Sequence, residues 1–178
     1  MALKPPIVSK NIRVRYPEHF VVGPGSIVDD FSYLSTKIRI GAGSHLCAGI
    51  TIAGGVAWQF VLGDYSSIAS GSRIYCNSND YANDLVTIVP AEAGIDEKPI
   101  QGDVIFGNYT GLGANSVVMP RNEVPEGTVI GALSFVPSGF TLEPWSVYAG
   151  IPVKYRGERD RKRVLEQAKR MDSLRDRG

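Results

Sequence analysis

The sequence of 178 residues is long enough for one domain with a sizeable core, because a chain of this size buries roughly 70% of the surface that it exposes when unfolded. Its formal net charge of +1, with 21% charged residues, provides neither a basic face for nucleic acid nor an acidic tail. The start, MALKPPIV, lacks the pattern of a secretory signal and no apolar run reaches a bilayer-spanning length, so we expect a soluble, cytoplasmic protein.

A six-residue period dominates the chain after an irregular start. Residues 1–21, with Pro5, Pro6 and Pro17, show no repeat, and we expect them to pack against the first coil. From residue 22 an aliphatic or aromatic residue returns at every sixth position. The first run consists of Val22, Val28, Leu34, Ile40, Leu46 and Ile52, and after a slip of phase in GGVAWQFVL the period resumes at Leu62, Ile68 and Ile74.

The segment 77–103 interrupts this period. It is rich in hydrogen-bonding side chains, among them Asn77, Asn79, Asp80, Tyr81, Asn83, Asp84, Glu92, Asp96 and Glu97. A loop of this length inside a compact repeat usually carries function. We therefore expect residues 77–103 to leave the repeat and to contact a substrate.

The period then returns without a gap over eight positions: Phe106, Leu112, Val118, Val124, Ile130, Val136, Leu142 and Tyr148. Small polar residues stand four places after many of these anchors, where a wide side chain would crowd an inner corner: Ser44, Ser66, Ser72, Thr110, Ser116, Thr128, Ser134 and Ser146. Glycine often follows the anchor directly, as in IGAG and LGAN, which indicates a positive φ or a close backbone approach.

Short strands joined by such bends, three to a turn, form a triangular prism with the anchors stacked inside, and coils ~4.8 Å apart. Glycine and proline density argues against long helices over residues 22–152, and an antiparallel sandwich would show a period of two. The sequence therefore predicts an all-β solenoid of the parallel β-helix type over residues 22–156.

Residues 157–178 change to charged helix formers, with Val164, Ala168, Met171 and Leu174 on one stripe, and predict a terminal helix that caps the coil.

Three segments resemble the hexapeptide-repeat acyltransferases: IGAGSHLCAGITI, LGDYSSIASGSRIY and LGANSVVMPRNEVPEGTVIGALSFV, followed by LEPWSVYAGIPVKY. The resemblance covers about residues 22–158, and AGIPVK is similar to the family's closing Gly-Asn-Pro-Ala-Lys motif with Ile151 in place of Asn. It implies a left-handed β-helix, a homotrimer with sites between subunits, and acetyl-CoA as co-substrate. Parallel crossovers are otherwise right-handed, so the left hand rests on the resemblance alone.

Acyl transfer from a thioester needs a base for the acceptor's proton, and the family commonly uses histidine for this task. Of the two histidines, His19 lies before the repeat and is interpreted as an ordinary surface residue, whereas His45 precedes an anchor and should face outward. Counting coils places His45 beneath Ser67 and near the edge from which the loop departs. The loop has Asn79 and Asp80 where relatives carry a histidine, so Asp80 is the second candidate; its alternative is an Asx turn.

The resemblance also implies the substrate contacts. The loop residues expected to bind a polyhydroxylated acceptor are Asn77, Asn79, Tyr81 and Asp84. The residues expected at the coenzyme are Gly113, Ala114, Ala132, Trp145, Lys154 and Arg156, the two cations at its phosphates. Each has a purely structural alternative, as corner, packing or solvated residue. Pro137 and Ser138 replace the Thr-Lys of many relatives, which removes one contact expected at the adenosine end.

The leading hypothesis is an acetyl-CoA-dependent acetyltransferase that modifies a nucleotide-linked amino sugar or a saccharide of a surface polysaccharide. A non-catalytic trimeric scaffold and an acyltransferase for a xenobiotic remain as alternatives. Two histidines cannot supply the three zinc ligands of the β-helical carbonic anhydrases, and no metal is expected. Cys47 and Cys76 match no metal spacing and are interpreted as reduced packing residues. The sequence leaves open the sugar, N- or O-acetylation, the acyl length, and whether His45 or Asp80 is the base.

Overall fold

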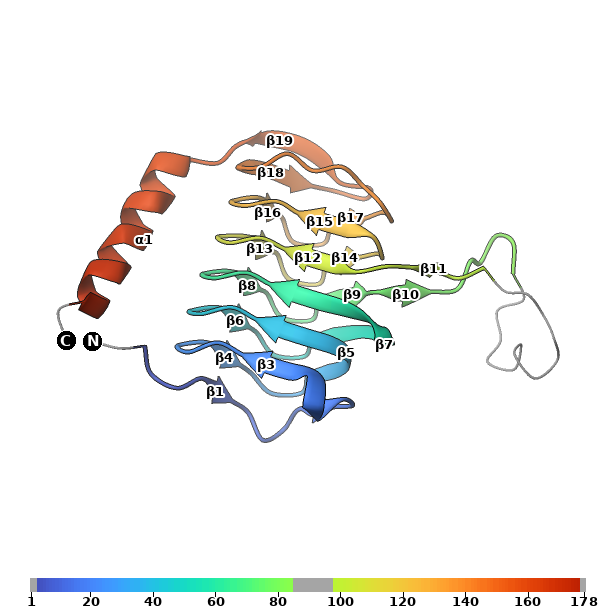
Figure 1. Ribbon diagram of the computed structural model, residues 1–178. Helices are drawn as coiled ribbons and strands as arrows, with labels where there is room; N and C mark the ends of the chain where they lie inside the picture. Colours follow the sequence, from blue (N-terminus) through green and yellow to red (C-terminus); the bar gives the residue numbers. More distant parts are fainter. Residues whose placement is uncertain (1–2, 85–97, 177–178) are drawn as a thin grey trace.

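The computed structural model describes residues 3–84 and 98–176, with side chains through Met171. The chain winds into a three-sided prism with a protruding hairpin on one side and a helix on the other (Figure 1). Parts of the loop prediction, including Glu92, Asp96 and Glu97, fall outside the described residues, as does Leu174 of the helix stripe. Within the described residues no helix is both long and apolar enough to cross a membrane.

Each face of the prism is a parallel sheet of short strands from successive coils. The first face contains β1 (Ile7–Val8), β4 (Ile27–Val28), β6 (His45–Leu46), β8 (Ser67–Ile68), β13 (Gly111–Leu112), β16 (Val129–Ile130) and β18 (Ser146–Ala149). β19 (Lys154–Glu158) closes this sheet as an antiparallel strand.

The other two faces share the long strands β5 (Tyr33–Ile40) and β7 (Thr51–Leu62), which bend around a corner. The second face adds β2 (Arg13–Val14), β9 (Arg73–Tyr75), β14 (Val117–Val118) and β17 (Phe135–Val136). The third face adds β3 (Phe20–Val22), β12 (Val104–Phe106) and β15 (Asn122–Val124). The 3₁₀ helix η1 (Pro17–His19) precedes β3. We call the corners after the first, second and third faces the first, second and third corners.

The predicted anchors form the core. Sixteen of the seventeen are buried, and Val22, near the open end, is partly buried against the same cluster. Phe60 and Phe106 pack with ring centroids 5.9 Å apart in the middle of the stack. The slip of phase is a local insertion: Ile52 and Leu62 are ten positions apart instead of six, and the four extra residues lie at the second corner, where β7 breaks its register with β5.

The small residues four places after the anchors are buried, as predicted. Their hydroxyls satisfy backbone carbonyls of the next coil: Ser26 Oγ donates to Gly41 O, Ser44 Oγ to Gly63 O and Ser66 Oγ to Gly107 O at the third corner. A buried carbonyl without a hydrogen-bond donor would destabilise the fold by about 1–3 kcal/mol. Each of these serines therefore both fills the corner and donates the hydrogen bond that the carbonyl needs.

The glycines directly after anchors are needed for close approach and not for a positive φ. A Cβ on Gly63 would lie 2.5 Å from the Gly107 carbonyl carbon, and one on Gly113 would lie 2.2 Å from the Ala132 nitrogen. The positive φ falls two residues later, for example at Tyr65 and Leu133. Each such corner therefore uses one position, the glycine, for close backbone approach and another position, two residues later, for the positive φ.

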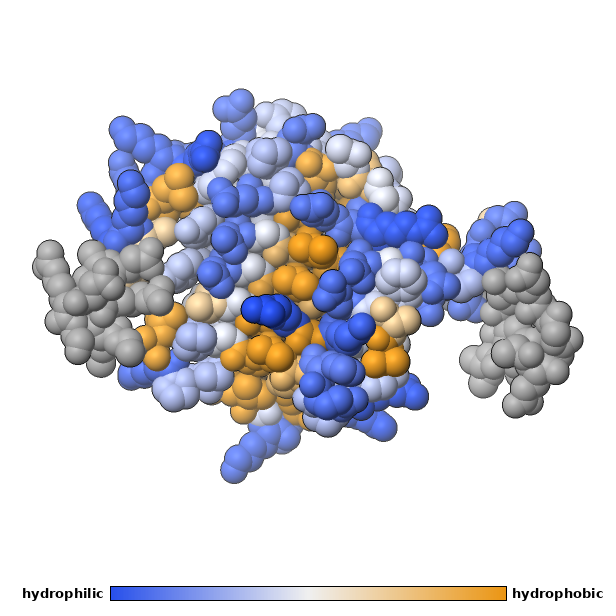
Figure 2. Space-filling model, viewed as in Figure 1, coloured by the Kyte–Doolittle hydropathy of each residue, from blue (hydrophilic) through white to orange (hydrophobic). Residues whose placement is uncertain are grey.

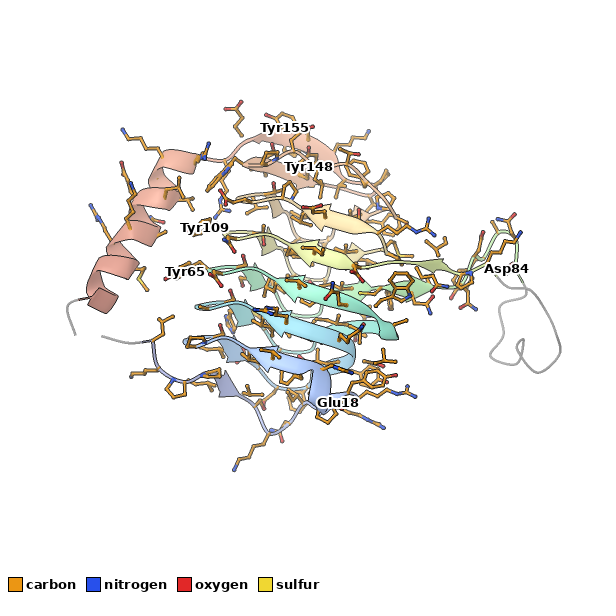
Figure 3. All side chains as sticks on the ribbon, in the orientation of Figure 1. Glu18, Tyr65, Asp84, Tyr109, Tyr148 and Tyr155 are labelled. Carbon is orange, nitrogen blue, oxygen red and sulfur yellow. The ribbon has the colours of Figure 1, made fainter. Side chains whose placement is uncertain are left out.

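The two ends of the solenoid differ from the predicted boundaries. β1, β2 and β3 pair in parallel with the next coil, so residues 7–22 form a first turn themselves and do not merely pack against one. The helix α1 (Arg161–Asp176) begins at Arg161, after β19 has crossed the end of the coil. α1 lies against the third corner, where Tyr65 and Tyr109 point toward it (Figure 3).

We expect Gly63→Ala to destabilise the protein by about 2–3 kcal/mol, because its methyl group would meet backbone that cannot move aside. Gly111→Ala is the matched control, since its Cβ would lie 3.3 Å from Val129 Cγ1, a side-chain atom that can shift. We expect a cost below about 1 kcal/mol for the control. Urea unfolding followed by circular dichroism measures both, and equal losses would contradict the close approach at the corner.

Candidate functional site

The loop leaves the prism at the second corner on a two-stranded stalk. β10 (Asn77–Ser78) pairs antiparallel with β11 (Ile100–Gln101), and the hairpin extends away from the coils (Figure 1). Gln101 fixes the stalk: its Oε1 accepts from Trp58 Nε1 at 2.8 Å, and its carbonyl accepts from Arg121 Nε at 2.9 Å. Trp58 belongs to the four-residue insertion, so the two interruptions of the repeat support each other.

A cleft of about 400 Å³ lies where the stalk meets the second face. It is lined by Tyr75, Asn77, Ser78, Asn79, Tyr81 and Met119. Three of the four loop residues predicted to bind substrate, Asn77, Asn79 and Tyr81, therefore come together. Amide, hydroxyl and aromatic groups around one cleft suit a polyhydroxylated ligand.

The two loop aspartates hold the shape of the loop. Asp80 Oδ1 accepts from the Ala82 backbone N–H at 3.0 Å, and its Oδ2 accepts from Asn83 Nδ2 at 2.7 Å. The bond from Asn83, followed by that from Ala82, lowers the pKa of Asp80, so the carboxylate stays ionised. Asp84 Oδ2 accepts from the Lys98 backbone N–H at 2.8 Å. The Asx turn considered from the sequence is thus present at Asp80, and neither aspartate lines the cleft.

His45 projects from the first face, beneath Ser67 as predicted. Its Nε2 lies 2.8 Å from Asp29 Oδ2, and its Nδ1 lies 3.6 Å from Cys47 Sγ. The side chains of His45 and Asp29 are 41% and 42% exposed, so a ligand can reach them. Asp29, His45 and Cys47 form a group of three side chains whose potential metal-ligand atoms all lie within 4.8 Å of one another. Among the described residues it is the one such group of three or more His, Cys, Asp or Glu side chains.

The structure corrects one placement of His45. The sequence puts it near the edge from which the loop departs, but the loop leaves from the second corner, and the whole second face separates that corner from the first face. Coil counting gave the correct height along the axis and not the correct side of the prism. Within one chain, His45 and the loop cleft are therefore two separate sites.

The residues predicted at the coenzyme do not all lie together. Gly113, Ala114 and Ala132 follow β13 and β16 at the first corner, where Leu133 N donates to Ala114 O. Gly113 also has its structural role there, because a Cβ would strike the Ala132 backbone. Ala132 is exposed, which leaves the outer side of this corner open to a ligand.

Trp145 lies at a different corner from these small residues. It is part of an aromatic column at the third corner, with its ring centroid 6.1 Å from that of Tyr109 and the Arg161 guanidinium 5.4 Å above it. Its packing alternative is therefore well supported. Lys154 and Arg156 are exposed on β19, where the last coil ends. A phosphate contact remains a prediction for both.

Sequence reasoning missed Asp29 and assigned Cys47 only a packing role. Cys76 is fully buried, as predicted for a packing residue, and burial raises the pKa of its thiol to about 12. Cys47 is only partly buried and its sulfur faces His45. A signal was present, because Asp29 and Cys47 are 18 positions apart, which is one regular turn of three hexapeptides.

Comparisons with known proteins agree with this fold and its enzymatic character. No protein-family model matches the chain. The dTDP-4-amino-4,6-dideoxy-D-glucose acyltransferase of Escherichia coli is 29% identical over 150 residues, which cover 82% of this chain and 74% of that protein. A probable macrolide acetyltransferase of Lysinibacillus sphaericus is 28% identical over 107 residues, 54% of this chain and only 58% of that protein.

Solved structures cover almost the whole chain. A variant of AntD, an N-acyltransferase from Bacillus cereus, in complex with dTDP-4-amino-4,6-dideoxyglucose and coenzyme A, has a TM-score of 0.86 and 28% identity, over 97% of this chain and 90% of that chain. A hexapeptide transferase family protein from Anaplasma phagocytophilum shares the fold at 16% identity and a TM-score of 0.60, over 97% and 93% of the two chains. The chain is thus similar in sequence to acyltransferases and in fold to hexapeptide-repeat transferases.

These similarities confirm the predicted left-handed β-helix class with a protruding loop and a C-terminal helix. Because the relatives and structural neighbours of the chain are acyltransferases, the non-catalytic scaffold considered from the sequence is not retained. The roles of individual residues are not tested by the comparisons and stay predictions.

We expect Gln101→Ala to loosen the stalk of the loop, because it removes the acceptor of Trp58 Nε1. Amide exchange at Asn77 and Ser78 should accelerate about fivefold, the equivalent of a hydrogen bond worth ~1 kcal/mol. Gln59→Ala, which removes a bond to Asp103 Oδ2, is the control and should leave these amides unchanged. Hydrogen exchange with mass spectrometry distinguishes the variants, and unchanged exchange in both would contradict the support assigned to Gln101.

Proposed function

We propose that this protein transfers an acyl group, acetyl as predicted from the sequence, from acyl-CoA to the amino group of a nucleotide-linked sugar. The observation that carries the proposal is the match of 97% of the chain to the AntD structure, which holds coenzyme A and a dTDP-linked amino sugar. The E. coli relative, named for the same type of sugar, supports it from sequence. Products of this type would supply a surface polysaccharide such as O-antigen or capsule, in the cytoplasm where both substrates are made.

The loop cleft is the proposed acceptor site. Asn77 and Asn79 offer amide donors and acceptors to sugar hydroxyls, and the Tyr75 and Tyr81 rings offer apolar faces to the pyranose or to the base. Asp80 stands on the same loop as an ionised carboxylate whose oxygens each retain a free lone pair. Asp80 does not line the cleft, but it stands on the loop between Asn79 and Tyr81, which do, and we assign it to holding the acceptor's amino group beside the cleft. We assign Asp84 to supporting the loop.

The outer side of the first corner is the proposed donor site. The small residues Gly113, Ala114 and Ala132 leave room for an extended pantetheine arm beside the coils, and Lys154 and Arg156 at the end of the coil suit its phosphates. Trp145 lies at the third corner, so we assign it to packing under α1 and not to the adenine.

Acyl transfer requires the donor site and the acceptor site to lie next to each other. We infer that a second copy of the chain brings them together. The first face with His45 and the second corner with the loop lie apart in one chain, whereas a hairpin that extends from the prism can reach a neighbour (Figure 1). An apolar stripe also runs down the third face (Figure 2), where Val21, Val61 and Ile105 lie in register beside Arg39. A homotrimer, as the family resemblance implies, would cover such surfaces.

Acetylation of an antibiotic is the second candidate function. It is favoured by the macrolide acetyltransferase relative and by chloramphenicol acetyltransferases, such as that of Agrobacterium fabrum at 26% identity over 144 residues. The cleft separates the two candidates by its chemistry, because amide side chains favour a hydroxylated sugar over a macrolide of large apolar surface.

We expect release of coenzyme A from acetyl-CoA with dTDP-4-amino-4,6-dideoxyglucose, and at most about 1% of that rate with a macrolide or chloramphenicol, the scale of discrimination that unmet polar groups produce. Thiol release followed with a colorimetric reagent measures all three acceptors. The same assay with longer acyl-CoAs sets the acyl length. Release with the antibiotics alone would replace the proposed function by the second candidate.

We expect Asp80→Asn to lower kcat/KM for the amino sugar by about 10²-fold, because the neutral amide loses the charge-assisted contact to the amine. Glu18→Gln, which removes one negative charge far from the loop (Figure 3), should leave kcat/KM unchanged. Full activity of the Asp80 variant would remove Asp80 from the site. Light scattering on the same samples tests the trimer, and a stable monomer with full activity would contradict transfer between copies.

A further inference from the structure

The second face of the prism carries positive charge only. Its strands contribute residues 13–14, 33–34, 51–52, 73–75, 117–118 and 135–136. These described residues include two arginines, Arg13 and Arg73, and neither an aspartate nor a glutamate. Arg73 lies in the middle of the face, where the register places it between Thr51 on one neighbouring coil and Val117 on the other. Both neighbours are uncharged, so neither neutralises the Arg73 guanidinium.

The guanidinium of Arg73 is held in place by a neutral group. Its Nη1 donates to the Gly71 carbonyl at 3.1 Å, and the residue is exposed. Among the described residues Arg73 forms no ion pair with a carboxylate. A guanidinium has five N–H donors and this bond uses one, so most of the donors remain for a ligand. A fixed charge of this kind is already arranged to receive an anion.

The acceptor cleft begins two residues further along the same strand. Arg73 and Tyr75 both belong to β9, and residues two apart on a strand point to the same side, with Cα atoms about 6.6 Å apart. Tyr75 lines the cleft together with Met119 of the next coil. After Cys76 the chain continues into β10 of the stalk (Figure 1). Arg73 therefore stands between the cleft and the first corner.

The chemistry of a nucleotide-linked sugar matches this arrangement. Its sugar is joined at the anomeric carbon to an anionic diphosphate, and through the diphosphate to the nucleoside. The stalk bounds the cleft away from the prism, and the second face extends from its other side. A diphosphate attached to a sugar in the cleft can therefore lie over the second face. Arg73 is the cation there, and its planar guanidinium can donate two parallel hydrogen bonds to phosphate oxygens.

We propose that Arg73 binds the diphosphate of the nucleotide-linked acceptor and makes the cleft selective for nucleotide-linked sugars over free sugars. This inference rests on the proposed function and names the residue that recognises its substrate class. Coenzyme A contains a diphosphate as well. Arg73 is assigned to the acceptor because it shares β9 with the cleft, whereas Lys154 and Arg156 stand at the end of the coil, where the donor's phosphates are assigned.

Calorimetric titration with dTDP alone tests this contact without any acyl transfer. Arg73→Gln should raise the Kd for dTDP by about tenfold or more, because charge-assisted hydrogen bonds are lost. Arg73→Lys should recover part of the affinity, since it keeps the charge and loses the planar fork. UDP should lose the same factor as dTDP in Arg73→Gln, because the contact is to the diphosphate and not to the base. Thermal midpoints show whether the variants fold.

Arg13→Gln is the matched control, because it removes the same charge from the same face. The register runs from Arg13 through Tyr33 and Thr51 to Arg73, so the two arginines are three coils apart, about 14 Å. That separation exceeds the Debye length of about 8 Å at physiological salt. The Kd for dTDP should therefore change by less than about twofold in Arg13→Gln.

Three results of the titrations would overturn the inference. The first is an equal Kd for dTDP in the wild type and in Arg73→Gln, and the second is a wild type that does not bind dTDP. The third is a loss of affinity for coenzyme A in Arg73→Gln with unchanged affinity for dTDP, which would assign the arginine to the donor. We expect the Kd for coenzyme A to be the same in both proteins.

Steady-state kinetics with acetyl-CoA and dTDP-4-amino-4,6-dideoxyglucose separates this inference from the proposed function. Arg73→Gln should raise the KM for the nucleotide sugar about tenfold and leave kcat within about twofold, because a contact remote from the reacting amine is the same in the ground and transition states. Acetylation with equal KM in both proteins would leave the proposed function standing and sink the role of Arg73. Binding of dTDP that depends on Arg73, without acetylation of any nucleotide sugar, would support the diphosphate contact and refute the proposed function.

Discussion

The structure depends on one packing constraint, which is the stacking of apolar side chains inside a prism too narrow for anything larger at its corners. Every sixth residue enters the stack, and buried serines and threonines close the corners while they donate to carbonyls of the next coil. Glycines after the anchors allow neighbouring corners to approach, because a Cβ there would strike backbone. Side chains that point outward are not part of this constraint, so the faces are free to carry chemistry.

The period of six was sufficient to predict the stack, since spacing alone decides which residues share the interior. It did not reveal the first turn, because β1, β2 and β3 pair with the next coil without keeping the period. It also placed His45 on the wrong side relative to the loop. The four residues added between Ile52 and Leu62, and the excursion after Tyr75, change how far the chain has travelled around the prism, and a residue count does not show at which corner they lie.

The candidate site was predictable in part, for related reasons. Asn77, Asn79 and Tyr81 line one cleft because they are close in sequence on the same stalk. Asp29 and Cys47 are neighbours only through the register of two coils, which the sequence carries as a spacing of 18 but does not mark as chemistry. Trp145 was expected with the coenzyme residues, and the structure places it one face away, in a column of aromatic rings beneath α1.

The functional groups of this protein are therefore divided between two rigid surfaces of the prism. The acceptor groups are on a hairpin that leaves the second corner, and the Asp29, His45 and Cys47 group is on the first face, so acyl transfer in a single chain would need a movement that the stacked core does not permit. A structure with coenzyme A bound tests this most directly. Its sulfur should lie on the first face beside His45, with the loop of a second copy across it. A sulfur inside the loop cleft of its own chain, or beside Trp145, would contradict transfer between copies at this face.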